Sequence, residues 1–224
     1  MAKQTSRRVE IENRRVADKA LFSKSSRQQA KVDVIVRAAA RLIYERGVAD
    51  TSLDDVAEAL GIAKPSLYYY VKNKEELIFL CNQRIFDLKE EALAAAEAEG
   101  RTGADKLARF LTALVKIVLD PESGMPRLWQ AGPQSILTGK RRKDIDRITQ
   151  AQSERIRGII REGMSDGSLH AQDAALAEAA MLGAVYWIPV SHLFDADADA
   201  DAVADAYVTM LFHGLDPRSR ADKR

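Results

Sequence analysis

The chain has 224 residues, of which 46% are hydrophobic and 30% charged, a composition that fits an ordinary globular protein with a sizeable core. The net charge is +1, but the charges are unevenly spread: residues 1–72 carry 14 Lys and Arg against 9 Asp and Glu, whereas the remaining residues carry a net negative charge. This distribution suits a module that binds a polyanion, joined to a second module. The single cysteine excludes a disulfide framework and the polar, charged first 15 residues exclude a secretory signal, so we expect a cytoplasmic protein.

The first 26 residues form a basic segment with few large apolar side chains. So little apolar surface cannot offset the entropy that the chain loses on ordering, and the sequence therefore predicts a flexible arm. The basic side chains of this arm are Lys3, Arg7, Arg8, Arg14, Arg15, Lys19 and Lys24.

Two helices are predicted after the arm. In the first, which starts at about Arg27, apolar side chains recur at three- and four-residue steps until Gly47 ends the helix. The second helix is short, and Thr51 or Ser52 supplies its N-cap. Asp55 stands where it would complete a capping box with Ser52, and Gly61 ends the helix in a left-handed conformation. The stripe of the first helix consists of Val32, Ile35, Val36, Ala39, Leu42 and Ile43.

A third helix opens at Lys64-Pro65-Ser66, because the missing N–H of a proline costs nothing in a first turn. A long helix follows from an Asn73 cap to Gly100, with its stripe at Leu77, Ile78, Cys81, Ile85, Leu88 and Ala92. Capping residues and helix-ending Gly and Pro residues mark the helices that follow. Longer helices are predicted from Thr102 to Asp120, from Asp144 to Arg161 with a stop at Gly163, from Asp173 to Ile188, and from Asp201 to His213. One or two short helices are predicted between Pro121 and Gly139.

No segment alternates polar and apolar residues with a period of two, so the predicted fold class is all-α with about nine helices. The longest nearly apolar stretch, residues 174–194, is interrupted by Glu178, Pro189 and His192. We therefore expect a buried helix there and not a membrane span.

Two short helices joined by a glycine-containing turn match a helix-turn-helix, at about residues 52–71. The second helix of such a motif fits the DNA major groove, and its first residues face base edges and phosphates. Lys64 and Ser66 supply hydrogen-bond donors there. Tyr68, Tyr69 and Tyr70 point in three directions, so at most one of them can be buried. A plain helical hairpin that binds no DNA is the alternative.

The pattern around this motif is specific: Ile35-x3-Ala39-x2-Leu42-Ile43-x3-Gly47, Thr51-Ser52-Leu53-x2-Val56-Ala57-x2-Leu60-Gly61-Ile62 and Pro65-Ser66-Leu67-Tyr68-x-Tyr70-Val71-x2-Lys74-x2-Leu77. With these residues the segment 31–80, a little under a quarter of the chain, resembles the DNA-binding domain of the TetR family of bacterial transcriptional regulators. The resemblance implies a homodimer with a three-helix DNA-binding domain and a helical C-terminal domain that dimerises and encloses a ligand. The predicted regions are therefore the arm 1–26, a DNA-binding domain 27–73, an effector-binding and dimerisation domain 74–216, and a tail 217–224.

The resemblance also implies which residues lie near DNA. Asp54 and Asp55 place acid on the first helix of the motif, so we expect no phosphate contacts from side chains of that helix. We expect Arg7, Arg8, Arg14 and Arg15 of the arm to reach the minor groove or phosphates, with a solvated tail as the alternative. The implied DNA-binding residues are Thr51, Ser52, Lys64, Pro65, Ser66, Tyr68, Tyr69, Tyr70 and Lys74, and Lys72 joins them because it flanks a helix start that favours a phosphate.

The segment from Ala179 to Val190 is too apolar to face water on any side. In the family, the last two helices of each subunit pair with those of the partner in a four-helix bundle, where small residues permit close approach. The residues predicted at this dimer interface are Ala180, Gly183, Ala184, Val208, Leu211 and Phe212.

Large side chains of the C-terminal domain are candidates for effector binding, with ordinary core or interface packing as the alternative. The sequence pattern Gly183-x2-Tyr186-Trp187-x-Pro189 is similar to that of regulators of fatty-acid and sterol breakdown within the family. This resemblance would imply an acyl or acyl-CoA effector. The basic residues Arg127 and 140–143 would then meet a CoA phosphate, or simply form an exposed basic turn. The ligand-binding candidates are Phe110, Leu114, Met125, Trp129, Gln130, Tyr186, Trp187, His192 and Phe194.

Enzyme motifs are lacking in the sequence, which shows no nucleophile elbow, no phosphate-binding glycine loop and no closely spaced metal ligands. The Asp-Ala alternation from Asp195 fails as a calcium loop, because Ala200 and Ala206 occupy its glycine and glutamate positions, so we expect its acids to favour the next helix N-terminus. We expect no enzyme activity, cofactor or metal. The sequence predicts a DNA-binding repressor released by a small-molecule effector; the alternative is a helical small-molecule-binding or enzymatic protein with an incidental helix-turn-helix.

Overall fold

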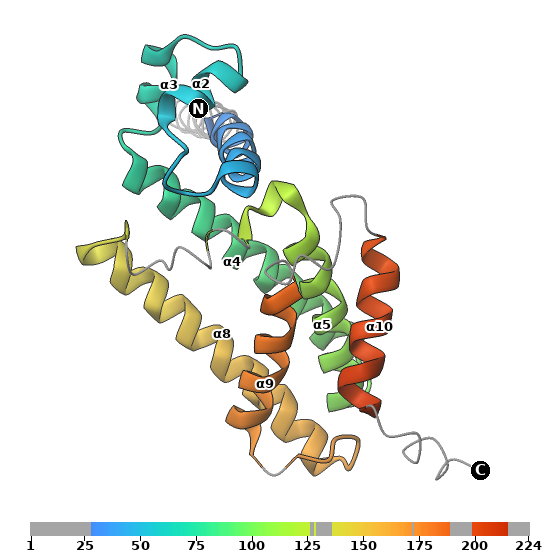
Figure 1. The fold of residues 1–224 in the computed structure, drawn as a ribbon. Helices are drawn as coiled ribbons and strands as arrows, with labels where there is room; N and C mark the ends of the chain where they lie inside the picture. Colours follow the sequence, from blue (N-terminus) through green and yellow to red (C-terminus); the bar gives the residue numbers. More distant parts are fainter. Residues whose placement is uncertain (1–27, 126–127, 129–135, 172, 189–198, 215–224) are drawn as a thin grey trace, which may run out of the picture.

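The computed structural model describes residues 28–125, 128, 136–171, 173–188 and 199–214 (Figure 1). Every regular element among them is a helix, which confirms the all-α prediction. Residues 28–46 are helical, and the predictions for the arm and the C-terminal tail concern residues outside the described ranges. The elements that follow are α2 (Leu53–Ala59), α3 (Lys64–Tyr70), α4 (Lys74–Glu99), α5 (Gly103–Leu119), the 3-10 helix η1 (Pro121–Ser123), α8 (Gly139–Ser165), α9 (Ala174–Trp187) and α10 (Ala200–His213).

The predicted helix caps form as expected. Ser52 caps α2 in a complete capping box, in which its hydroxyl accepts from the Asp55 backbone N–H and the Asp55 carboxylate accepts from the Ser52 N–H at 2.7 Å. Asn73 caps α4 by accepting from the Glu76 N–H at 2.8 Å. The turn between α2 and α3 passes through Gly61 at φ +62°, the left-handed conformation that favours glycine. Local chemistry therefore fixes where the helices of the motif begin and end.

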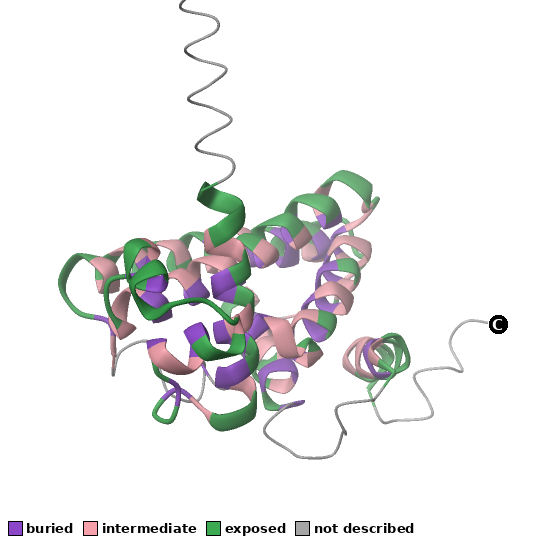
Figure 2. Cartoon of the chain, turned by 90° about the horizontal axis from the view of Figure 1, so that it is seen from above, coloured by how far each residue is buried: buried purple, intermediate pink, exposed green. Residues whose placement is uncertain are grey.

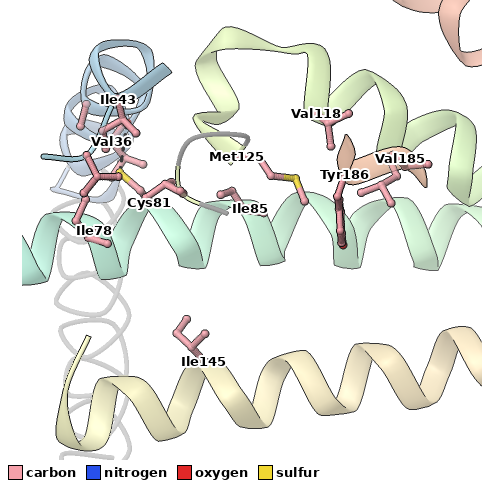
Figure 3. Packing of buried hydrophobic residues seen from close by; sticks show 14 of the residues in the cluster. Val36, Ile43, Ile78, Cys81, Ile85, Val118, Met125, Ile145, Val185 and Tyr186 are labelled. Atoms are coloured by element: carbon pink, nitrogen blue, oxygen red, sulfur yellow. Dashed lines mark hydrogen bonds between the residues drawn. The ribbon is translucent and has the colours of Figure 1, made fainter. Parts of the chain in front are cut away.

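Helix α4 belongs to both halves of the molecule. Near its start it packs against the helical segment 28–46, where Ile78 and Cys81 meet Val36 and Ile43 (Figure 3). Further along it packs against α5 and α8, and α5 in turn contacts α9 and α10. One continuous cluster of buried apolar side chains runs through all of these helices. A displacement of α4 in the C-terminal half would therefore reach the helix-turn-helix.

The apolar stripe of α4 differs from the predicted one in its second half. Leu88 and Ala92 are only half-buried, whereas Leu93 and Ala96 are buried. The prediction was wrong there because it continued the stripe from Ile85 along the three-residue step, while the buried face follows the four-residue step. That face passes through Lys89, a position that an apolar pattern cannot reveal.

Helix α8 was predicted too short at both ends. It begins at Gly139 rather than near Asp144, and it runs through Gly163 to Ser165. Gly163 lies against Gly103 at the start of α5, so closely that a Cβ on Gly103 would lie 2.1 Å from the Gly163 backbone nitrogen. The two glycines therefore permit a close helix crossing, and Gly163 is not a helix stop.

Helix α9 packs against α8 and α5, and α10 packs against α5. Asp173 caps α9 and Asp199 caps α10, each with a side-chain oxygen that accepts from backbone N–H groups of the first turn. Helix α10, seen end-on beside the C-terminus in Figure 2, carries exposed positions on its outer side. No helix in the described part of the chain is long and apolar enough to cross a membrane.

Candidate functional site

Helix α3 presents almost its whole surface to solvent. Leu67 is its single buried residue and anchors the helix to the core. Tyr68 is 46% exposed and Tyr69 73% exposed, although large aromatic side chains usually bury most of their surface. Tyr70 is half-buried, so none of the three phenols belongs to the core, in agreement with the expectation that at most one could. The helix therefore offers two phenols outward.

The N-terminus of α3 is open to a partner. Its cap residue, Ala63, has no side chain that can accept from the first backbone N–H groups, and Lys64, Pro65 and Ser66 are all exposed. These N–H groups point along the helix dipole, which favours an anion at this end. The end of α3 that a helix-turn-helix directs at DNA is thus both uncapped and accessible.

Lys64 is paired with Asp54 of α2, with its Nζ 2.8 Å from a carboxylate oxygen. The hydrogen bond to Asp54 raises the pKa of Lys64. Both side chains are largely exposed, and an exposed pair of this kind contributes little to stability. Asp54 therefore shields Lys64 in the free protein without holding it strongly.

Lys72 and Lys74 lie at the junction of α3 and α4. The Lys72 backbone N–H donates to a Glu76 carboxylate oxygen at 2.7 Å, and its side chain is exposed. Lys74 Nζ donates to the Ala49 carbonyl at 2.8 Å, which fixes the ammonium beside the loop before α2. Two lysines thus lie at the start of α4.

The hydroxyl groups of two predicted DNA-binding residues are engaged within the motif itself. Thr51 is 2% exposed and its hydroxyl donates to the Gly47 carbonyl at 2.8 Å, so its side chain is not available at the surface. Ser52 is exposed, but its hydroxyl serves in the capping box. These two side chains hold the motif in shape.

Tyr70 faces a groove between α3 and the helical segment 28–46. Lys31 lies with its Nζ 5.7 Å from the centre of the Tyr70 ring, close enough for a cation–π interaction. The groove is also lined by the exposed Val34 and Ile62. Sequence patterning did not single out Lys31, because no periodic signal marks a lysine that stacks on a ring.

Acidic residues at the start of α4 hold the start of α8. Thr138 donates to Glu75 through its backbone N–H and its hydroxyl, both at 3.0 Å, and these bonds lower the pKa of Glu75. Arg141 pairs with Glu75 at 3.5 Å and with Glu76 at 3.6 Å. Residues 140–143 lie in the first turns of α8, where Lys140 and Lys143 are exposed. Arg141 is held by carboxylates instead of being free for a phosphate.

The effector candidates fall into four groups, of which the last is Trp187 alone. Phe110 and Leu114 are fully buried in α5 and pack within the core. Met125 is also buried and lines a cavity of about 40 Å³ together with Asn82, Ile85, Phe86, Lys89, Leu128 and Thr149. Tyr186 is buried beside it, and its ring centre lies 5.9 Å from Lys89 Nζ. Trp129, Gln130, His192 and Phe194 lie outside the described residues.

Trp187 lies on the surface and not in the cavity. It is 62% exposed, and Leu176, further back on α9, is 71% exposed. Ala180 and Gly183 between them are exposed as well, so α9 carries one continuous apolar face that no described part of the chain covers. On α10, Val208, Leu211 and Phe212 are half-buried and pack against the core.

Metal sites are absent from the part of the chain that the structure describes, where no three His, Cys, Asp or Glu side chains converge. Cys81 is buried, and burial raises the pKa of its thiol to about 12, which disfavours the reactive thiolate. The side-chain clusters that stand out are therefore the exposed α3 with its lysines and the cavity beside α4.

Comparison with known proteins agrees with this arrangement. Residues 35–81 match the family model described as "Bacterial regulatory proteins, tetR family", and residues 100–215 match "Tetracyclin repressor-like, C-terminal domain". The two models thus cover the helix-turn-helix and most of the helices after α4.

Individual relatives and solved structures that resemble the chain are also transcriptional regulators. The HTH-type transcriptional regulator TtgR of Pseudomonas putida is 32% identical over 77 residues, which are 34% of this chain and 36% of that protein. The HTH-type transcriptional repressor KstR2 of Rhodococcus jostii is 23% identical over 193 residues, 86% of this chain and 92% of that protein. The solved structure of AibR in complex with isovaleryl coenzyme A and operator DNA is 26% identical, covers 81% of this chain and 97% of AibR, and has a TM-score of 0.67. The chain belongs to the TetR family of bacterial transcriptional regulators.

Proposed function

We propose that the chain is a homodimeric repressor that binds a palindromic operator in the cytoplasm and is released from it by a small-molecule effector. The exposure of α3 carries this proposal, because only Leu67 of its seven residues is buried. A helix that buried its side chains for stability alone would not turn two tyrosines and a lysine outward. In a dimer, two such helices enter two major-groove half-sites.

The contacts follow from the positions of the side chains. Lys64, Ser66 and the open N-terminus of α3 face phosphates and base edges, and Pro65 starts the helix between them. Tyr68 and Tyr69 contact phosphates or thymine methyl groups, and Lys72 and Lys74 bind the backbone beside the start of α4. Thr51 and Ser52 support the motif from behind.

Dimerisation uses the apolar face of α9. Leu176 and Trp187 are the most exposed large apolar side chains of this helix, and contiguous exposed apolar surface is typical of an interaction site. Ala180, Gly183 and Ala184 between them allow a partner helix to approach closely. The outer side of α10, where Met210 is 37% exposed, completes the bundle around Val208, Leu211 and Phe212.

An acyl or acyl-CoA compound is the proposed effector. AibR, which shares the fold, was solved with isovaleryl coenzyme A, and the cavity beside α4 is lined mostly by apolar side chains. Helix α4 carries Lys74 at one end and lines the cavity with Asn82, Ile85, Phe86 and Lys89. A ligand that prefers one position of α4 shifts the spacing of the two α3 helices, with a coupling free energy of about 1–3 kcal/mol.

The double substitution Tyr68→Ala with Lys74→Ala tests the proposed interface. It should remove contacts of about 1–3 kcal/mol each and abolish the mobility shift of the gene's own upstream DNA at concentrations where the native chain binds. Dimerisation, measured by sedimentation, should be unchanged because both residues lie far from α9 in sequence and fold. Lys116→Ala, an exposed lysine of α5 paired with Asp201, is the control and should bind DNA normally. Retained binding by the double variant would refute the interface.

A further inference from the structure

The cavity beside α4 contains a buried lysine that the sequence analysis did not identify. Lys89 is 6% exposed and is one of the seven residues that line the cavity. Most buried lysines in proteins are neutralised by a carboxylate, because a lone ammonium loses its hydration on burial. Every contact of this side chain therefore matters for what the cavity can hold.

The ammonium group lies between two aromatic rings. Lys89 Nζ is 5.5 Å from the ring centre of Phe86 and 5.9 Å from that of Tyr186. Figure 3 shows Tyr186 directed at α4, with Ile85 on that helix and Met125 over it, on the segment that follows η1. Within the described ranges no carboxylate lies within ion-pair distance of Lys89, although arginines of α8 form several ion pairs with glutamates of α4. Two rings stabilise the charge partly, and neither supplies the opposite charge.

From this geometry we propose that the cavity binds the carboxylate of a short aliphatic acid, with Lys89 as its counter-charge. The proposal rests on the proposed effector-binding role and narrows it to a free acid. The other polar group deep in the cavity, Asn82, is 6% exposed and donates one amide N–H to the Ile78 carbonyl at 2.8 Å, which leaves a second N–H for a ligand. Donors from Lys89 and Asn82 together match an acceptor-only carboxylate.

Size and lining define the rest of the ligand. One water molecule needs roughly 10–15 Å³ of cavity volume. The cavity of about 40 Å³ therefore accommodates a group of a few heavy atoms, such as a carboxylate with a short chain. Ile85, Met125 and Leu128 give the chain an apolar wall, and Met125 can change rotamer to admit a longer one. Thr149 on α8 also lines the cavity and is exposed to solvent, which gives the ligand a way in.

Calorimetry on the full chain tests the proposal with defined probes: acetate, butyrate and hexanoate, each against its amide. A carboxylate should bind at least about tenfold more tightly than its amide, because a charge-assisted hydrogen bond to the Lys89 ammonium is lost in the amide. The substitution Lys89→Met should remove this preference. Lys106→Met is the matched control, since Lys106 is also mostly buried but is paired with Glu162 at 2.6 Å, away from the cavity.

Thermal unfolding separates a ligand-binding lysine from a structural one. Without ligand, Lys89→Met should be at least as stable as the native chain, because methionine replaces an unpaired buried charge. Butyrate should raise the Tm of the native chain and of Lys106→Met, and leave that of Lys89→Met unchanged. Equal binding of acid and amide, unchanged binding by Lys89→Met, or preference for a CoA thioester over the free acid would overturn the proposal.

The outcome is independent of DNA binding. If butyrate binds through Lys89 while the chain fails to shift its upstream DNA, the carboxylate site stands and the proposed repressor function fails. If the chain shifts DNA but no carboxylate binds, the repressor function stands and the carboxylate site is refuted.

Discussion

Lys64 illustrates how a side chain at the open end of α3 is held in the free protein. Its partner Asp54 lies on α2, and the pair is exposed on both sides, with side-chain exposures of 64% and 47%. A phosphate at the same place would compete with the Asp54 carboxylate for one ammonium. Asp54 was one reason to expect no phosphate contacts from α2. In the proposed complex it acts on DNA binding indirectly, through Lys64, the lysine that it holds.

Replacing Asp54 with Asn should strengthen operator binding. The change frees Lys64 and removes a negative charge near the proposed phosphate path, and the loss of an exposed pair corresponds to at most about 1 kcal/mol, or about fivefold in affinity. Fluorescence anisotropy with labelled operator measures the effect at two salt concentrations. Glu58→Gln, which removes an exposed acid of the same helix that makes no ion pair with Lys64, should have a smaller effect. Equal or weaker binding by the Asp54 variant would show that Lys64 does not contact phosphate.

Two tyrosines and a lysine show the limit of pattern-based prediction at this scale. That at least one of the three phenols is exposed could be predicted, because three successive side chains on a helix cannot share one buried face; the structure exposes Tyr68 and Tyr69. The burial of Lys89 could not, since a charged residue at a core position contradicts the pattern used to find the core. Its four-residue spacing from Ile85 was the one available signal.

At the scale of helices, the crossing of α5 and α8 depends on two glycines. A Cβ on Gly103 would lie 2.1 Å from the backbone nitrogen and 2.3 Å from the Cα of Gly163, and backbone atoms cannot yield as a flexible side chain can. Gly103 N–H also donates to Asp166 at 2.9 Å, which ties the start of α5 to the end of α8. Any side chain at Gly103 must push the two helices apart.

The substitution Gly103→Ala should destabilise the protein by about 1–3 kcal/mol in denaturant unfolding, because overpacking forces a backbone shift. Gly158→Ala on α8 is the matched control, since a Cβ there meets nothing within 4 Å. It should be neutral or stabilising by up to about 1 kcal/mol, from the higher helix propensity of alanine. A Gly103 variant as stable as the control would mean that the helices do not cross this closely.

Helix boundaries were predictable where a side chain caps the helix. Ser52, Asn73, Thr102 and Asp173 all cap the helices assigned to them, because capping is a local interaction that the sequence displays directly. The start of α8 was missed because Thr138 makes no side-chain cap and is held by Glu75, 63 residues away in sequence. The role of Gly163 was missed for the same reason: its partner Gly103 lies on another helix.

At the scale of the whole molecule, two surfaces have no partner among the residues that the structure describes. One is the exposed side of α3, and the other is the apolar face of α9 with Leu176 and Trp187. The sequence predicted that α9 must be covered on more than one side, and in one chain Glu178, Val185 and Tyr186 are its buried residues. A second copy and a DNA duplex together would cover both surfaces.

The basic arm before residue 27 is proposed to add to this DNA contact. Deleting residues 2–24 should weaken operator binding and reduce the salt dependence of the affinity, by a slope of up to about 0.9 for each phosphate that Arg7, Arg8, Arg14 or Arg15 neutralises. Titrations at several salt concentrations give this slope. An unchanged slope would identify the arm as a solvated tail without DNA contacts.

The presentation of two α3 helices by one dimer is tested most directly by hydroxyl-radical footprinting of the purified chain on its own upstream DNA. The account predicts two protected patches related by a two-fold axis and separated by about 10 base pairs, one for each α3, and both absent for the variant with Tyr68→Ala and Lys74→Ala. A single patch, or protection that the variant retains, would contradict it.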